Sequence, residues 1–344
     1  MPLPELFFWP TTFDSHISDL LVAFAVSGVV FISLILGACA WAAWNLVSRP
    51  YLNRVSFRLL VYALVANLAY GGCMIGVVEL GPGAACSGVA FLIDVCLMFS
   101  AVMFFCVALN LQLVLVHGFN GQRMEKYYIL AAVITSLGTS IPPYAAGRFG
   151  YWPGNETCWL NSLDPAVQLR WWIASQGLWM LLMSAGEVVT FFVIVGSVIM
   201  RHRTTSAIST GASSSSSFIA APKPAIVLYR KIIIRIGLYP LVSCFLSFTA
   251  GVLDLHVILD SAQTETNWRL SIVDLLVYSL RPMFYAVLAA TDPSFIRALR
   301  TLLRLESGNP EVNTSASLSV AFDTEIYVSS IKSEDESGAF ARQI

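Results

Sequence analysis

Charged residues are scarce in this chain of 344 residues, and their scarcity restricts the class of protein. Only 12% of the residues are charged, 57% are hydrophobic, and the mean hydropathy is +0.72. A soluble globular domain carries about 25% charged residues. A chain with so few could not cover its surface with polar groups in water, so its solvent must largely be lipid. The net charge of −1 argues against a nucleic-acid partner.

Targeting, metal-binding and catalytic patterns are also missing. Residues 1–19 lack a basic region, a short apolar core and a small-residue cleavage site, so we expect no removable signal peptide. The seven cysteines form no C-x-x-C pair, and we expect no structural zinc site. The histidines are isolated, without clustered acidic residues. We therefore expect neither an enzyme nor a cofactor.

Long apolar runs are what the chain has in abundance. Each membrane crossing needs about 20 mostly apolar residues, because a helix rises about 1.5 Å per residue through about 30 Å of hydrocarbon. Helices are expected rather than barrel strands, since a helix satisfies its own backbone hydrogen bonds in lipid. The sequence predicts an all-α integral membrane protein, a seven-transmembrane helix bundle. Its spans are 20–46, 57–79, 87–116, 127–147, 171–199, 232–253 and 270–290.

Positive charges are distributed unequally between the two sides of these spans. The loops of one side contain only Arg148, Arg170 and Arg269. The positive-inside rule therefore places residues 1–19 outside and the C-terminus in the cytosol. The cations of the cytosolic side include Arg49, Arg54, Arg123, Arg201, Arg203, Arg230 and Lys231. Arg235 lies four residues past Lys231, within the sixth span, and can extend to the cytosolic interface.

Two features of the outer side are consistent with this orientation. Cys86 and Cys158 are the only cysteines outside or at the edge of the spans, and both lie on the oxidising side, so we predict a disulfide between them. Closing a loop of about 70 residues could contribute about 4 kcal/mol in the chain-entropy model. Asn155 begins a glycosylation sequon in the same outer loop.

Ionisable residues inside the bilayer usually face a bundle interior. From the outer side, Asp94 lies about 12 Å deep, Arg281 about 16 Å and Glu187 about 22 Å. Arg281 cannot lose its proton and needs a partner; depth matching favours Asp94, with Glu187 second. Together with Asn67 these residues form a predicted polar centre. It either holds an inactive bundle that a ligand rearranges, or serves only in assembly.

The cytosolic side contains candidate regulatory features. Pro240 is a candidate hinge for movement of the sixth span. Thr204 and Ser206 each follow an arginine by three residues, so both are candidate phosphorylation sites in the Ser-rich loop 200–231. We expect this loop and the tail 307–344 to be disordered. Residues 292–306 predict a short amphipathic helix on the inner leaflet, with Asp292 as its N-cap.

Several segments resemble one family of receptors. The resemblance spans roughly residues 20–305 and depends on RPYLNRVSFR at 49–58, the following residues 59–70, LNLQLVLVH at 109–117 and NGQRMEK at 120–126. Shorter matches are PPY at 142–144, CW at 158–159, GE at 186–187 and LYP at 238–240. These segments are similar to fungal seven-span receptors grouped with the cyclic-AMP-receptor-like and secretin-like (family 2) G-protein-coupled receptors.

The resemblance implies a plasma-membrane receptor that transmits an extracellular signal to a heterotrimeric G protein, with Cys86 and Cys158 as the family's bridging pair. The cytosolic cations, Arg235 included, would then face the G protein, and membrane lipids would surround the bundle. The chain has no Asp-Arg-Tyr after the third span and no Asn-Pro-x-x-Tyr in the seventh. Fewer than 20 residues precede the first span, so a small, still unknown ligand or nutrient fits better than a bulky peptide.

Other membrane classes remain as alternatives. A retinal protein would need a lysine in the seventh span, and every lysine lies in a loop or the tail. A seven-span transporter of a small solute should show internal repeats or paired broken helices. We find no clear repeat between the first three and last three spans, although a transporter stays possible.

Overall fold

The computed structural model describes residues 11–77, 80–117, 119, 121–152, 157–162, 164–211, 225–259 and 265–306. Most of these residues are helical. The helices are α1 (Thr11–Trp44), α2 (Arg49–Leu52), α3 (Val55–Val77), α4 (Ala84–His117), α5 (Gly121–Ala145), α6 (Pro165–Trp172), the π-helical turn η1 (Ile173–Gly177), α7 (Leu178–Gly211), α8 (Ala225–Leu259), α9 (Glu265–Ala290) and α10 (Pro293–Glu306). Two strands, β1 (Phe149–Trp152) and β2 (Thr157–Leu160), complete the fold.

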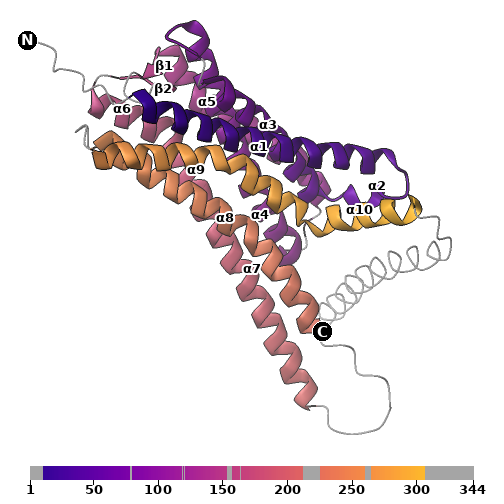
Figure 1. The fold of residues 1–344 in the computed structure, drawn as a ribbon. Coiled ribbons are helices and arrows are strands. Elements are labelled where there is room, and N and C mark those ends of the chain that lie inside the picture. Colours follow the sequence, from indigo (N-terminus) through magenta and orange to yellow (C-terminus); the bar gives the residue numbers. More distant parts are fainter. Residues whose placement is uncertain are drawn as a thin grey trace, which may run out of the picture.

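The long helices pack side by side as an elongated bundle (Figure 1). The two strands and α6 lie near one end of the bundle, which we call the hairpin end. The helices α2 and α10 lie near the other, which we call the α10 end, and α7 with α8 projects beyond the rest of the bundle there.

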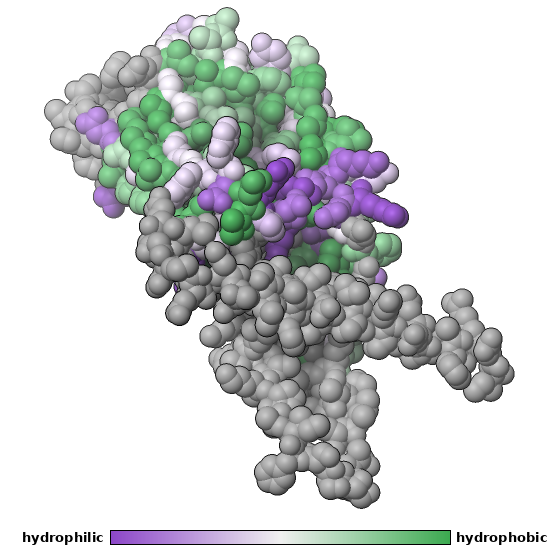
Figure 2. Space-filling model, turned by 90° about the vertical axis from the view of Figure 1, so that its right-hand side faces the viewer, coloured by the Kyte–Doolittle hydropathy of each residue, from purple (hydrophilic) through white to green (hydrophobic). Residues whose placement is uncertain are grey.

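The chain is a multi-pass helical membrane protein. Six helical segments among the described residues are long and apolar enough to cross a membrane. They are Asp19–Trp44, Val55–Val77, Ala84–Val114, Pro165–Ser197, Leu241–Leu259 and Arg269–Ala290. Hydrophobic residues also cover much of the upper part of the surface in Figure 2. Six of the predicted spans thus coincide with apolar helices, and the fourth, at 127–147, stays a prediction.

The segment predicted as the fourth span forms α5, whose two faces have an unusual distribution of side chains. The buried face carries hydroxyl groups, among them Ser136, Thr139 and Ser140. The exposed face is apolar and follows helical spacing; it contains Tyr127, Leu130, Ile134, Leu137, Ile141 and Tyr144. A helix in water shows the opposite arrangement, so α5 has the side-chain distribution of a helix that faces lipid.

The hairpin was not predicted, because the long apolar runs of the sequence indicated only helices. The strands are antiparallel, with Phe149 opposite Leu160 and Tyr151 opposite Cys158. Aromatic residues favour strands. Phe149, Tyr151 and Trp159 are therefore the local signal from which this pairing could have been predicted. Ser87 on α4 donates a hydrogen bond to the Phe149 carbonyl at 2.9 Å, which holds the hairpin on the bundle.

Several helices extend beyond their predicted spans. The prediction of a disordered loop over 200–231 is wrong at both ends, because α7 continues to Gly211 and α8 begins at Ala225. No proline or glycine interrupts the chain between Met200 and Thr210, so helix geometry can continue into water. Likewise α1 already begins at Thr11, within the predicted N-terminal segment 1–19. Residues 212–224 and the tail 307–344 lie outside the described residues.

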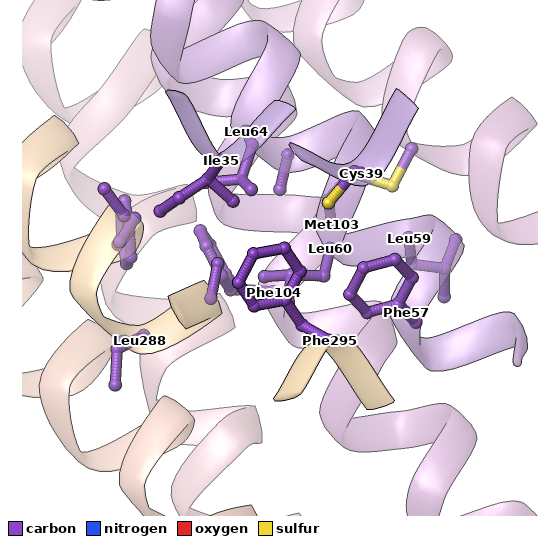
Figure 3. Packing of buried hydrophobic residues seen from close by; sticks show 14 of the residues in the cluster. Ile35, Cys39, Phe57, Leu59, Leu60, Leu64, Met103, Phe104, Leu288 and Phe295 are labelled. Atoms are coloured by element: carbon purple, nitrogen blue, oxygen red, sulfur yellow. The ribbon is translucent and has the colours of Figure 1, made fainter. Parts of the chain in front are cut away.

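The apolar core forms two clusters, one toward each end. The cluster at the α10 end includes Phe57, Phe104 and Phe295, which are labelled near one another in Figure 3. Phe295 reaches it from α10, which begins at Pro293 after Asp292 caps the Ser294 backbone N–H at 2.7 Å. The predicted cap and amphipathic helix are therefore confirmed. The second cluster packs α4, α6 and α9 beneath the hairpin.

Candidate functional site

The predicted polar centre is divided among separate contacts between helices. Asn67 on α3 donates to Ser100 on α4 at 2.6 Å. Asp94 on α4 accepts from Ser140 on α5 at 2.7 Å. No ion pair joins Asp94 to Arg281, so the pairing favoured by depth is wrong. Depth fixes the position of a residue along its helix, but the rotation of the helix decides its neighbour, and Asp94 faces α5.

Arg281 and Glu187 are instead linked through α8. Arg281, 1% exposed, donates to Ser247 at 3.2 Å and to the Tyr285 hydroxyl at 3.4 Å. Glu187, also 1% exposed, accepts from Ser243 at 3.2 Å. Ser243 and Ser247 are one helical turn apart, so both lie on one face of α8. The positive charge of Arg281 also interacts electrostatically with Glu187. Side chains of α8 therefore lie between the carboxyl group on α7 and the guanidinium group on α9.

A second polar network, which was not predicted from the sequence, lies at the hairpin end. Its centre is Asp254 on α8, which accepts hydrogen bonds from Tyr278 on α9 at 2.7 Å and from the Trp172 indole at 3.1 Å. Gln176 donates to the same Tyr278 hydroxyl at 2.8 Å. The carboxyl group of Asp274 on α9 lies close enough to Asp254 to interact with it. The network therefore connects α6, η1, α8 and α9.

The π-helical turn η1 positions two members of this network. It widens the helix between Trp172 and Leu178, and such turns are frequent at functional sites. Ser175, Gln176 and Gly177 are all buried there. A Cβ atom on Gly177 would lie 2.6 Å from the Trp172 ring, so only glycine leaves room for the indole that reaches Asp254.

Two signals in the sequence could have revealed this network. Asp274 and Tyr278 are four residues apart and therefore share a helix face, yet neither was recognised as a site residue. Asp254 was placed just beyond the predicted end of the sixth span at 253, whereas α8 continues to Leu259. The apolar segment of α8 runs over Leu241–Leu259, so Asp254 lies inside it and the predicted end at 253 was too early.

The predicted disulfide is present. Cys86, at the beginning of α4, is bonded to Cys158 on β2. Both residues are buried at the hairpin end. The bond joins α4 to the strand that also brings Trp159 toward the polar network, where its ring centroid lies 6.4 Å from that of Tyr278. The disulfide and the network therefore stabilise the same end of the bundle.

Polar contacts among the described residues also join helices at the α10 end. Arg58 forms an ion pair with Glu125 and so joins α3 to α5, and Asn110 on α4 donates to Ser56 at 3.0 Å. Tyr239 on α8 donates to the Leu288 carbonyl at 3.1 Å and to Asp292 at 3.3 Å. These contacts connect α8 to the junction between α9 and α10.

The predicted G-protein-facing cations are distributed around this end. Arg49, Arg54 and Arg123 are exposed on α2, at the start of α3 and on α5. A group of hydrophilic residues lies on the side where α2 and α10 are found (Figure 2). The remaining predicted cations belong to the projecting parts of α7 and α8 and are Arg201, Arg203, Arg230, Lys231 and Arg235.

The predicted phosphorylation, hinge and glycosylation sites remain predictions. Thr204 and Ser206 lie on α7, and Pro240 lies within the continuous helix α8. Asn155 lies outside the described residues. Within the described part of the chain, no group of three or more His, Cys, Asp or Glu side chains could hold a metal ion.

Comparison with known proteins gives no assignment: no protein-family model matches the chain, and no curated protein matches it. The residues and contacts described above, with the resemblance in the sequence, therefore carry the functional proposal.

Proposed function

We propose that this protein is a seven-span G-protein-coupled receptor of the plasma membrane, with the hairpin end outside and the α10 end in the cytosol. The observation that carries the proposal is the Cys86–Cys158 disulfide, because the resemblance to fungal family 2 receptors implies this pairing. It joins the third long helix to the loop between the fourth and fifth long helices. Disulfides persist in oxidising compartments, which favours the hairpin end as the outer one.

The seventh crossing in this proposal is α5. Its exposed face is apolar and its buried face carries hydroxyl groups, which is the distribution expected of a helix surrounded by lipid on one side. Asp94 and Ser140 hydrogen-bond inside the bundle, so α5 is joined to α4 at membrane depth. With α5 included, an odd number of crossings places the two ends of the chain on opposite sides.

The arrangement of α8 supports signal transmission. Asp254 of this helix belongs to the hairpin-end network. Further along the helix, Ser243 bonds to Glu187 and Ser247 to Arg281. At the α10 end, Tyr239 contacts the junction between α9 and α10. A ligand that altered the outer contacts would therefore bias the position of the inner part of α8. Exposed cations at that end suit a negatively charged surface of a Gα subunit.

The test is nucleotide-sensitive association with Gα subunits in membranes, followed by energy transfer from the C-terminal tail. We expect a signal with one Gα class that collapses when GTP is added. The variant Arg54→Glu should weaken this signal at the proposed cytosolic face. Arg170→Glu, an exposed arginine at the opposite end, is its matched control and should leave the signal unchanged.

A transporter is the alternative, since buried charged groups such as Glu187 and Arg281 also mark solute pathways. Absence of association with every Gα, even after nutrient, peptide and lipid extracts are added, would favour it. Solute uptake into proteoliposomes would then be the decisive measurement.

A further inference from the structure

The carboxyl groups of Asp254 and Asp274 form a direct contact between α8 and α9. The two carboxyl groups lie close enough to interact with each other. Two ionised carboxylates in such a position repel each other. Ionised carboxylates are acceptors only, so a hydrogen bond between the two groups requires a proton on one of them.

The surrounding donors indicate which group carries the proton. Asp254 receives the Tyr278 hydroxyl and the Trp172 indole N–H, and both bonds stabilise its ionised form. Asp274 is 8% exposed, and no hydroxyl or amide of the described residues donates to its buried Oδ1. A proton on Asp274 removes this deficiency, because the protonated group can donate to Asp254.

Gln176 fixes the direction of the hydrogen bonds from a third element. Its amide nitrogen donates to the Tyr278 hydroxyl, so the single hydroxyl proton of Tyr278 is available for Asp254. The Gln176 side chain is 1% exposed, and its Oε1 atom has no hydrogen-bond partner among the described residues. The network therefore supplies Asp254 with donors, whereas none of the described residues donates to Asp274 Oδ1.

No basic side chain is found among the hydrogen-bond partners of the two carboxyl groups. Tyr70 on α3 donates to the Tyr278 carbonyl, and Arg281 on α9 is engaged by Ser247 and Tyr285. The cations nearest in sequence are exposed at helix ends; they are Arg170 on α6, His256 on α8 and Arg269 on α9. A proton is therefore the species that reduces the repulsion between the pair.

We propose that Asp254 and Asp274 form a proton-binding site that joins α8 to α9 and makes the hairpin end sensitive to pH. With the proton bound, the two helices are hydrogen-bonded. Loss of the proton leaves two carboxylates facing each other, which drives the ends of α8 and α9 apart. In the orientation proposed above the site would respond to extracellular pH, but proton binding itself requires neither that orientation nor a G protein.

The test measures the apparent Tm of the full chain in lipid nanodiscs by tryptophan fluorescence, from about pH 5 to about pH 8.5. Nanodiscs expose both faces, so the result does not depend on the proposed function. Stability falls with rising pH wherever the folded state holds more protons than the unfolded chain, and we expect a fall of about 5 °C. Asp274→Asn keeps a donor to Asp254 without titrating, so it should lose at least half of this fall.

Asp94→Asn is the matched control, because Asp94 is also buried but accepts a hydrogen bond from Ser140, with no second carboxyl group among its described partners. It should lose less of the fall than Asp274→Asn, and the reverse order would overturn the proposal. Tyr278→Phe provides a second test if Asp274→Asn does not fold. It removes a donor to ionised Asp254, so the folded state should keep the shared proton to higher pH, and the pH at which the fall ends should rise by about one unit. An unchanged end point would contradict the shared proton.

Discussion

The hairpin end and the α10 end of the bundle are held together in different ways. At the hairpin end a disulfide joins α4 to β2, and a network of hydrogen bonds connects α6, η1, α8 and α9 around Asp254. Among the described residues of the α10 end, the polar contacts include the Arg58–Glu125 ion pair and single hydrogen bonds such as those of Tyr239. There α7 and α8 also project beyond the bundle (Figure 1).

The difference indicates where the molecule can change shape at low energy. A partly exposed ion pair contributes less than about 1 kcal/mol, whereas the disulfide contributes about 4 kcal/mol in the chain-entropy model. Rearrangement at the α10 end therefore requires less free energy than rearrangement at the hairpin end. In the receptor that we propose, this asymmetry would let the hairpin end hold a ligand site while the α10 end opens for a G protein.

The largest expected effect comes from removing the disulfide. Cys86→Ser frees a loop with a sequence separation of 72 residues, and we expect a loss of about 4 kcal/mol of unfolding free energy. Unfolding in mixed micelles of lipid and SDS would measure it. Cys244→Ser, at a free and partly buried cysteine on α8, is the control and should change stability by less than about 1 kcal/mol. Equal losses would show that the disulfide does not stabilise the hairpin end.

A smaller effect is expected at the π-helical turn. In Gly177→Ala the new Cβ would meet the Trp172 ring, which cannot move without losing its hydrogen bond to Asp254. We expect a loss of about 1–3 kcal/mol. Gly72→Ala on α3 is the control, since its Cβ would meet no atom within 4 Å. That variant should be neutral or stabilise by up to about 1 kcal/mol through helix propensity. Matching losses in both variants would mean that Gly177 does not position Trp172.

These regions differ in how far the sequence predicted them. Apolar runs located the helices, because a helix in lipid needs apolar side chains. The Cys86–Cys158 pair was identified because these are the two cysteines expected on the oxidising side of the membrane. The cap of α10 followed from Asp292 and Pro293, whose geometry is local. Such features depend on short stretches of chain, so they could be read without the fold.

The contacts between helices could not be predicted in the same way. A residue's neighbour depends on how each helix is rotated, and successive residues differ by about 100° around the axis. Depth therefore matched Arg281 to Asp94, whereas rotation directs Asp94 to Ser140 and Arg281 to Ser247. The hairpin-end network needed in addition the extension of α8 to Asp254 and the π-helical turn, and the turn has no clear signature in hydropathy.

The smallest change in stability, with the clearest consequence for function, is expected at Tyr239. Tyr239→Phe removes the hydroxyl that joins α8 to the Leu288 carbonyl and to Asp292 at the α10 end. The hydroxyl shares one proton between a carbonyl and a carboxyl oxygen, so its loss should cost about 1 kcal/mol and the variant should still fold. Because the lost contacts hold the inner part of α8 against the junction of α9 and α10, we expect about a fivefold increase in ligand-independent association with Gα.

Tyr62→Phe, at an exposed tyrosine on α3, is the matched control and should leave both stability and association unchanged. If Tyr239→Phe lowered stability by several kcal/mol, the α10 end would be as tightly held as the hairpin end. If it lowered stability slightly without changing association, the contact would be structural, and movement of α8 would not be the step that opens the α10 end. An increase in association at small cost in stability would identify α8 as the element through which the rigid end controls the mobile one.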